Sequence, residues 1–200
     1  EEKGATEGSI NVEDTAWVDV PQGFETPAIK VGIEKELNLA DEWAIYDVTS
    51  REEAYGHSVE DTRWVIRFDA EDGSSVIVQP NNLEAIERLA RQTELVVRAR
   101  LTVRQYRWRE QREDIFSPAS MQNTGRLVDL YAVKFGWPTF TSDATRAFWQ
   151  VPQTEKCFVK PPPEWMEQHA AAGGSESDLW LLKRWLYGQR KAPQAWTAWH

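Results

Sequence analysis

The chain has few of the residues that build disulfide frameworks and zinc sites. Its 200 residues include one cysteine, Cys157, and three separated histidines, His57, His169 and His200. One cysteine cannot form an internal disulfide framework or a cysteine-based zinc site, and no histidine cluster compensates. Disulfide-stapled domains and Cys/His zinc proteins are therefore excluded as classes.

Long apolar runs are also missing. The opening stretch, EEKGATEGS, has neither a basic region nor an apolar core, and no later segment is long and apolar enough for a transmembrane helix. We expect no signal peptide and no contact with a membrane, and we place the protein inside the cell, in the cytoplasm or nucleus. Hydrophobic content of 41% fits a globular chain with one sizeable domain or two small lobes.

Charge is distributed unevenly along the chain. The net charge of −9 argues against a simple nucleic-acid binder. However, Glu1 to Glu60 contain 15 acidic and 4 basic residues, whereas the rest of the chain has 17 acidic and 19 basic residues. Between Arg91 and Arg112, seven arginines accompany only two glutamates. The acidity thus belongs to one end, and a basic stripe lies in the middle.

The hydrophobic patterns predict an α+β fold. Residues 1–26 are acidic and weakly periodic, which is typical of a disordered tail. Apolar residues at helical spacing predict helices over 28–38, 81–92 and 123–133. Short runs of aromatic and β-branched residues predict strands over 43–46, 63–67 and 157–160, and a strand followed by a turn over 140–148.

Local signals refine three of these elements. Asp72-Gly73 between Ile66 and Val76 predicts a hairpin turn. Asn81 is the expected N-cap of the second helix, with Glu84 at the capping-box position. The apolar run at 179–186 fits a helix or a strand equally well.

The segment 95–108 alternates apolar residues with arginines and predicts a strand with an apolar back and a cationic front. Such a strand is commonly an edge strand protected by charge. The planar fork of arginine also suits phosphate, and the charges here are nearly all of one sign, which favours phosphate contact.

The stretch TSDATRAFWQVP, from Thr141 to Pro152, places one carboxylate, Asp143, before an aromatic pair. An isolated aspartate in such a place is a turn residue, a helix cap or one ligand of a metal. The stretch itself does not separate these three readings.

Two segments resemble one known family. LYGQRKAPQAW, from Leu186 to Trp196, resembles the LYGLKQAPRAW signature of copia-type retrotransposon reverse transcriptases. DATRAF, from Asp143 to Phe148, resembles that family's first polymerase motif, D-V-x-x-A-F. Weaker matches lie in the same order as in the family, at Trp43, 63–65, 98–101, 114–118, Arg126, 136–137 and 158–161. The resemblance covers residues 29–200.

The resemblance implies an RNA-directed DNA polymerase with a right-hand fold, in which a mixed or antiparallel sheet packs on helices. Residues 1–27 would be the acidic tail, 28–135 the fingers and 136–200 part of the palm. The implied partners are an RNA template, a DNA primer, deoxynucleotides and the other parts of the polyprotein, namely the rest of the palm, RNase H and integrase.

Polymerases of this kind hold two Mg²⁺ ions, which clamp the attacking and leaving oxygens. By the resemblance, Asp143 is a catalytic magnesium ligand at the end of a palm strand. The resemblance also places a nucleotide against Arg98, Arg100, Ala144, Arg146, Ala147, Phe148 and Gly188, with Arg100 on the triphosphate and Phe148 excluding a 2′-hydroxyl. It assigns nucleic-acid contacts to Arg104, Arg107, Lys191 and Trp196. Ordinary core packing explains Phe148 and Trp196 equally well.

The family's third palm motif, Y-x-D-D, does not occur in these 200 residues. Because one aspartate cannot hold two metals, we expect no polymerase activity from these residues alone. Three readings stay open: an inactive polymerase fragment, a non-catalytic nucleic-acid-binding remnant, and an acidic interaction protein.

Overall fold

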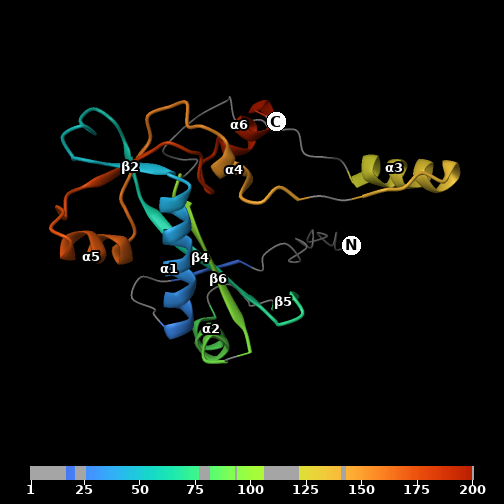
Figure 1. The fold of residues 1–200 in the computed structure, drawn as a ribbon, viewed down its shortest axis with the longest axis horizontal. Coiled ribbons are helices and arrows are strands. Elements are labelled where there is room, and N and C mark those ends of the chain that lie inside the picture. Colours follow the sequence, from blue (N-terminus) through green and yellow to red (C-terminus); the bar gives the residue numbers. More distant parts are fainter. Residues whose placement is uncertain are drawn as a thin grey trace, which may run out of the picture. The chain divides into compact units, whose positions relative to one another are not determined.

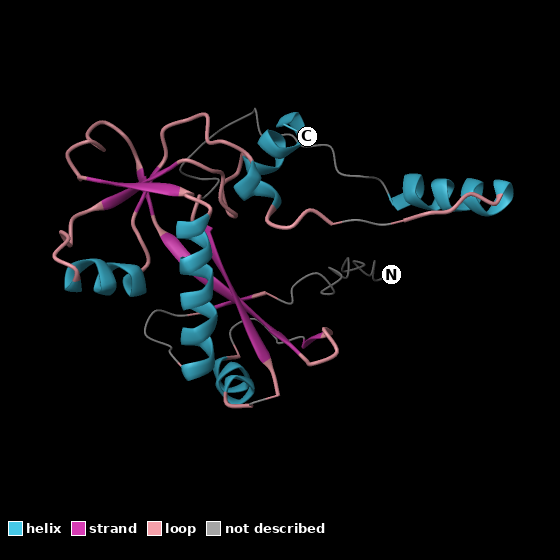
Figure 2. Ribbon diagram, in the orientation of Figure 1, coloured by secondary structure: helices cyan, strands magenta, loops and turns pink. Residues whose placement is uncertain are grey.

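A computed structural model describes residues 17–20, 26–76, 82–92, 94–105, 122–140 and 143–199 of the chain. These residues form six helices and eight strands, and the strands pair into two four-stranded sheets. The ribbon is drawn in Figures 1 and 2. One unit contains Glu1–Leu39 and Arg63–Leu101, and the other contains Ala40–Thr62 and Thr102–His200. The predicted α+β class with mixed and antiparallel sheets is confirmed.

The sheet of the first unit is built around β4 (Thr62–Asp69). Strands β1 (Val18–Asp19) and β5 (Ser75–Val76) pair with β4 in antiparallel fashion, and β6 (Val96–Val103) also pairs with it. Alternate residues of β4 and β6 are buried, as a sheet with one covered face requires. The buried apolar residues are Trp64, Ile66, Phe68, Val97, Ala99, Leu101 and Val103.

Two helices contribute apolar side chains to this core. Helix α1 (Pro27–Glu42) buries Ile29, Ile33 and Leu37, and α2 (Leu83–Ala90) buries Ile86. Helix α1 packs closely on β6 (Figure 1). The approach is close enough to require glycine at position 32, since a Cβ there would lie 2.9 Å from the carbonyl oxygen of Val97. The predicted helix at 28–38 and the strand at 63–67 are therefore confirmed.

The predicted hairpin is also confirmed. Asp69 pairs with Ser75, Gly73 adopts a positive φ of 82°, and the Asp72 carboxylate accepts the backbone N–H of Ser74 at 2.8 Å. The N-cap prediction is wrong by one residue. Asn82 caps α2 by accepting the N–H of Ala85 at 3.0 Å, and Asn81 lies outside the described residues.

The tail prediction is wrong for two residues. Val18 and Asp19 form strand β1, with Val18 opposite Ile66. The buried side chain of Val18 anchors this segment to the core of the sheet. A strand of two residues is too short to show an alternating pattern in the sequence. Residues 1–16 and 21–25 lie outside the described residues.

The sheet of the second unit has the order β2 (Tyr46–Thr49), β8 (Leu179–Leu182), β7 (Phe158–Val159) and β3 (Val59–Glu60). Only β3 and β7 are parallel. The Tyr46 ring stacks on Trp180 at 3.8 Å, and α5 (Pro163–Ala171) adds Trp165 edge-on at 5.2 Å. Strand 157–160 is thus confirmed, and the ambiguous run at 179–186 begins as a strand.

The predicted strand at 43–46 is displaced, because Ala44 has a φ of 47° and ends α1 in a turn. Its strand residues begin at Tyr46. The predicted helix at 123–133 is confirmed within α3 (Gln122–Phe135), which leaves Leu130 and Val133 exposed. None of the helices in the described part of the chain is long and apolar enough to cross a membrane.

The strand predicted at the start of 140–148 is not found in the described residues, whereas the turn predicted after it is present at 145–146. Phe140 and residues 143–146 are not in a strand, 141–142 lie outside the described residues, and α4 (Ala147–Gln150) follows at once. Arg146 precedes this helix in the left-handed conformation, with φ of 49° and ψ of 48°. This conformation interrupts an extended backbone.

Candidate functional site

The first motif, from Asp143 to Phe148, is a short loop that leads into α4. Asp143 and Ala144 are exposed. The side chain of Gln150 donates to the carbonyl of Thr145 at 2.8 Å and so ties the loop to the helix. The guanidinium of Arg146 lies 4.9 Å from the ring centre of buried Trp149. The Asp143 carboxylate is consequently presented to solvent from a loop instead of from a strand end.

The second motif, from Leu186 to Trp196, joins the end of β6. The backbone N–H of Val103 donates to the carbonyl of Tyr187 at 2.8 Å. Gly188 has a φ of 84°, and a Cβ there would overlap the carbonyl oxygen of Val103. Gly188 therefore allows the backbone of the second motif to lie close to strand β6 of the protein itself.

The structure brings the two motifs together. The Phe148 ring lies 5.0 Å from the Tyr187 ring at an angle of 57°. Phe148 and Trp196 both pack against a buried cluster made of Val151, Trp185 and Ala192. Helices α4 and α6 (Ala192–Trp199) are thereby held against each other, with Ala147 at the start of α4. The contacts of Phe148 and Trp196 are those of core aromatics.

Polar contacts fix the middle of the second motif. Buried Gln189 accepts the backbone N–H of Leu186 at 2.6 Å and donates to the sulfur of Cys157 at 3.4 Å. The Lys191 ammonium lies 2.6 Å from a carboxylate oxygen of Glu155. Lys191 thus makes an ion pair within the protein.

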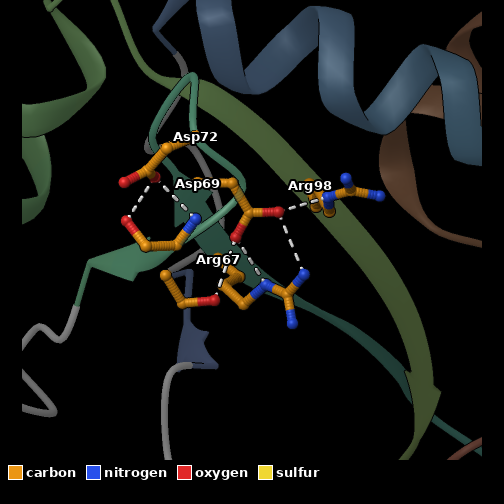
Figure 3. Close-up of polar contacts among 6 residues, drawn as sticks. Arg67, Asp69, Asp72 and Arg98 are labelled. Carbon is orange, nitrogen blue, oxygen red and sulfur yellow. Dashed lines mark hydrogen bonds and ion pairs between the residues drawn. The ribbon is translucent and has the colours of Figure 1, made fainter.

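The cationic side of the first unit consists of side chains that alternate with buried ones. We call Arg63 and Arg67 on β4, together with Arg98 and Arg100 on β6, the arginine face. Asp69 lies among them with its side chain only 3% exposed. Arg67 donates from Nη2 to one Asp69 oxygen at 2.9 Å, and Arg98 binds the same carboxylate from β6 (Figure 3).

These contacts determine the charge of Asp69. Burial by itself raises the pKa of the Asp69 carboxyl, but hydrogen bonds from Arg67, Arg98 and Ser75 outweigh burial and hold the pKa below its ordinary value. Asp69 is therefore an anion near neutral pH. Part of the positive charge that the sequence assigns to the stripe is balanced inside the sheet.

Further contacts of the arginine face come from β1 and the residue before it. The Arg100 guanidinium lies 4.2 Å from the ring centre of Trp17, and that of Arg67 lies 5.1 Å from it. Asp19 forms an ion pair with Arg63 at 2.6 Å. Trp17 and Asp19 lie two residues apart and hence on one side of β1, whereas Val18 points into the core.

The other predicted cationic contacts are placed as follows. Arg104 is half-buried, and its backbone N–H donates to the carbonyl of Asp61 at 2.8 Å. Arg107 lies outside the described residues.

Sequence reasoning missed Arg67, Asp69, Trp17 and Asp19. The first two follow the same alternation that identified β6, since Trp64, Ile66 and Phe68 are apolar and Arg67 and Asp69 fall between or beside them. The alternation of β4 could therefore have placed Arg67 and Asp69 on the face opposite the core. Trp17 and Asp19 carry no such signal, because β1 has only two residues.

Within the described residues, no group of three or more His, Cys, Asp or Glu side chains is placed to hold a metal ion. Comparisons of the chain with family models, curated proteins and solved structures found no match.

Proposed function

We propose that the chain corresponds to the fingers and the first part of the palm of a copia-type reverse transcriptase, and that these residues bind nucleic acid without catalysing polymerisation. The observation that carries the proposal is the contact of Phe148 with Tyr187. The two segments that resemble polymerase motifs are far apart in sequence, yet they pack on each other. The second segment also bonds through Tyr187 to Val103, which lies in the same unit at the end of β6.

The residues present do not fit a two-magnesium centre. Asp143 offers one exposed carboxylate, and the described residues bring no group of three potential metal ligands together. Magnesium requires several oxygen ligands in octahedral geometry. We therefore assign Asp143 no catalytic step in this chain, and we keep its role as a metal ligand for a complete site.

The arginine face is the surface that suits a template or primer backbone. Four guanidinium groups lie in one sheet with one buried carboxylate, Asp69, between two of them. Arginine binds phosphate oxygens through a planar pair of donors. The expected ligand is an RNA template paired with a DNA primer, and Arg100 is the residue proposed to contact phosphate or a nucleotide.

Binding of a labelled RNA–DNA hybrid to the chain tests the proposal. We expect the affinity to fall steeply with salt and to decrease in Arg100→Ala. Arg91→Ala is a matched control, because Arg91 also belongs to the first unit but pairs with Glu87 on α2. Equal binding by the wild type and by Arg100→Ala would remove the arginine face from the proposal.

A second candidate function is suggested by the acidic residues 1–60. An acidic protein-interaction module would bind no hybrid at any salt concentration. That outcome would favour this candidate over the nucleic-acid reading.

A further inference from the structure

We infer that the segment Trp17–Asp19 is an intramolecular competitor for the arginine face, so that the chain weakens its own binding to polyanions. The inference rests on the proposed nucleic-acid function only in the choice of the natural ligand. It is carried by three contacts: the ion pair of Asp19 with Arg63, and the guanidinium groups of Arg67 and Arg100 beside the Trp17 ring.

The two side chains present the chemical groups of a nucleotide. Asp19 brings an anion to a guanidinium, as a phosphate would. Trp17 brings a flat π system to Arg100 at 4.2 Å, and single-stranded bases use the same kind of contact with arginine planes. Since Trp17 and Asp19 point to the same side of β1, one short segment meets three of the four arginines.

The segment is held in place independently of these contacts. Val18 is 2% exposed and pairs with Ile66, and Asp19 pairs with Val65 through the antiparallel ladder. The backbone pairing therefore keeps Trp17 and Asp19 at high effective concentration over the arginine face. The surrounding sequence favours the same contact, because residues 1–26 contain seven acidic residues and one lysine.

A purely structural role for β1 makes a different prediction. If β1 serves only to cover the core, it stabilises the fold through the buried side chain of Val18 and the backbone pairing with β4. Changing the Asp19 charge would then leave polyanion binding as it is. Asp19→Asn separates the two roles, because the amide is isosteric and the Asp19 side chain is 53% exposed.

The test measures binding of a labelled 20-nucleotide single-stranded RNA and of linear polyphosphate to the whole chain over a range of salt concentrations. For Asp19→Asn we expect roughly a two- to fivefold tighter Kd for both probes, the size of an exposed ion pair. The slope of log affinity against log salt should become steeper by about 0.7, for one additional phosphate contact.

Two variants control for other causes. Asp47→Asn removes the same charge from another exposed ion pair, with Lys183 at 3.2 Å, and should tighten binding less than Asp19→Asn. In an Arg63→Ala background, Asp19→Asn should bring no gain, because the arginine that Asp19 occupies is gone.

The outcomes separate the inference from the proposed function. Tighter binding of both probes by Asp19→Asn than by Asp47→Asn supports both. Tighter binding of polyphosphate, with no RNA binding by any variant, supports self-competition and overturns nucleic-acid binding. Equal effects of the two asparagine variants, or a gain that persists without Arg63, overturn self-competition.

Discussion

Arg67 and Asp69 form a two-point ion pair on one side of β4. Arg67 Nη2 lies 2.9 Å from one carboxylate oxygen of Asp69, and Arg67 Nε lies 2.8 Å from the other. Residues two apart on a strand share a face, so the strand geometry itself sets this pair. Arg98 reaches the same carboxylate from β6, which ties the two strands together through one anion.

This pair predicts a specific pH dependence of stability. Because the pKa of Asp69 is lower in the folded chain than in the unfolded chain, its contribution to stability is present above the unfolded value of 3.8 and is lost as the pH falls through the folded value. Urea unfolding of the wild type between pH 7 and pH 2 should show this loss.

Asp69→Asn should remove that component. At pH 7 we expect the free energy of unfolding to fall by about 2 kcal/mol, the size of hydrogen bonds to a charged partner. The difference between the variant and the wild type should shrink as the pH falls. A constant difference from pH 7 to pH 2 would contradict the assignment.

Gly188→Ala is expected to destabilise the chain strongly. The substitution places a side chain at a φ of 84° and also drives its Cβ into the backbone of Val103. Gly56→Ala is the matched control, because Gly56 has a φ of 80° with nothing within 4 Å of its Cβ position. We expect about 1 kcal/mol for Gly56→Ala, and roughly a further 1–3 kcal/mol for Gly188→Ala, by urea unfolding. Equal losses would show that the strand contact has no energetic weight.

Gln189→Leu tests the polar anchor of the second motif. The Gln189 side chain is buried and accepts the N–H of Leu186 at 2.6 Å, so leucine leaves a buried donor without its partner. We expect a loss of about 1–3 kcal/mol in the free energy of unfolding. Gln150→Leu removes an exposed side-chain contact to the carbonyl of Thr145 and should cost less, because water replaces the lost bond. The hierarchy is checked by comparing the two urea midpoints.

The elements that could be predicted are those fixed by local pattern. Alternation over β6 and helical spacing in α1 follow from which side chains must be buried, and both match the structure. The left-handed conformation of Arg146 before α4 could not be predicted, since it has no marker in the residue type.

Long-range pairing explains most of what the sequence concealed about the candidate site. Asp69 and Arg98 are 29 residues apart and meet only because β4 and β6 are neighbours. Net charge along the sequence therefore overstates the positive character of the stripe. The contacts of Trp17 and Asp19 with the arginine face are also long-range, and they come from residues that the sequence predicts to be a disordered tail.

Arg98 and Arg100 should behave differently when each is replaced by alanine, although they lie on the same side of one strand. Arg98 binds the buried carboxylate of Asp69, so Arg98→Ala should lower stability at pH 7 by about 1–2 kcal/mol, with a small effect on binding of an RNA–DNA hybrid. Arg100 lies over Trp17, where it is proposed to meet a ligand, so Arg100→Ala should weaken hybrid binding with a smaller effect on stability.

Thermal unfolding and fluorescence anisotropy on the same two proteins separate these roles. If Arg98→Ala weakens binding as much as Arg100→Ala and leaves unfolding unchanged, Asp69 does not hold Arg98 away from the ligand, and both arginines act as phosphate contacts.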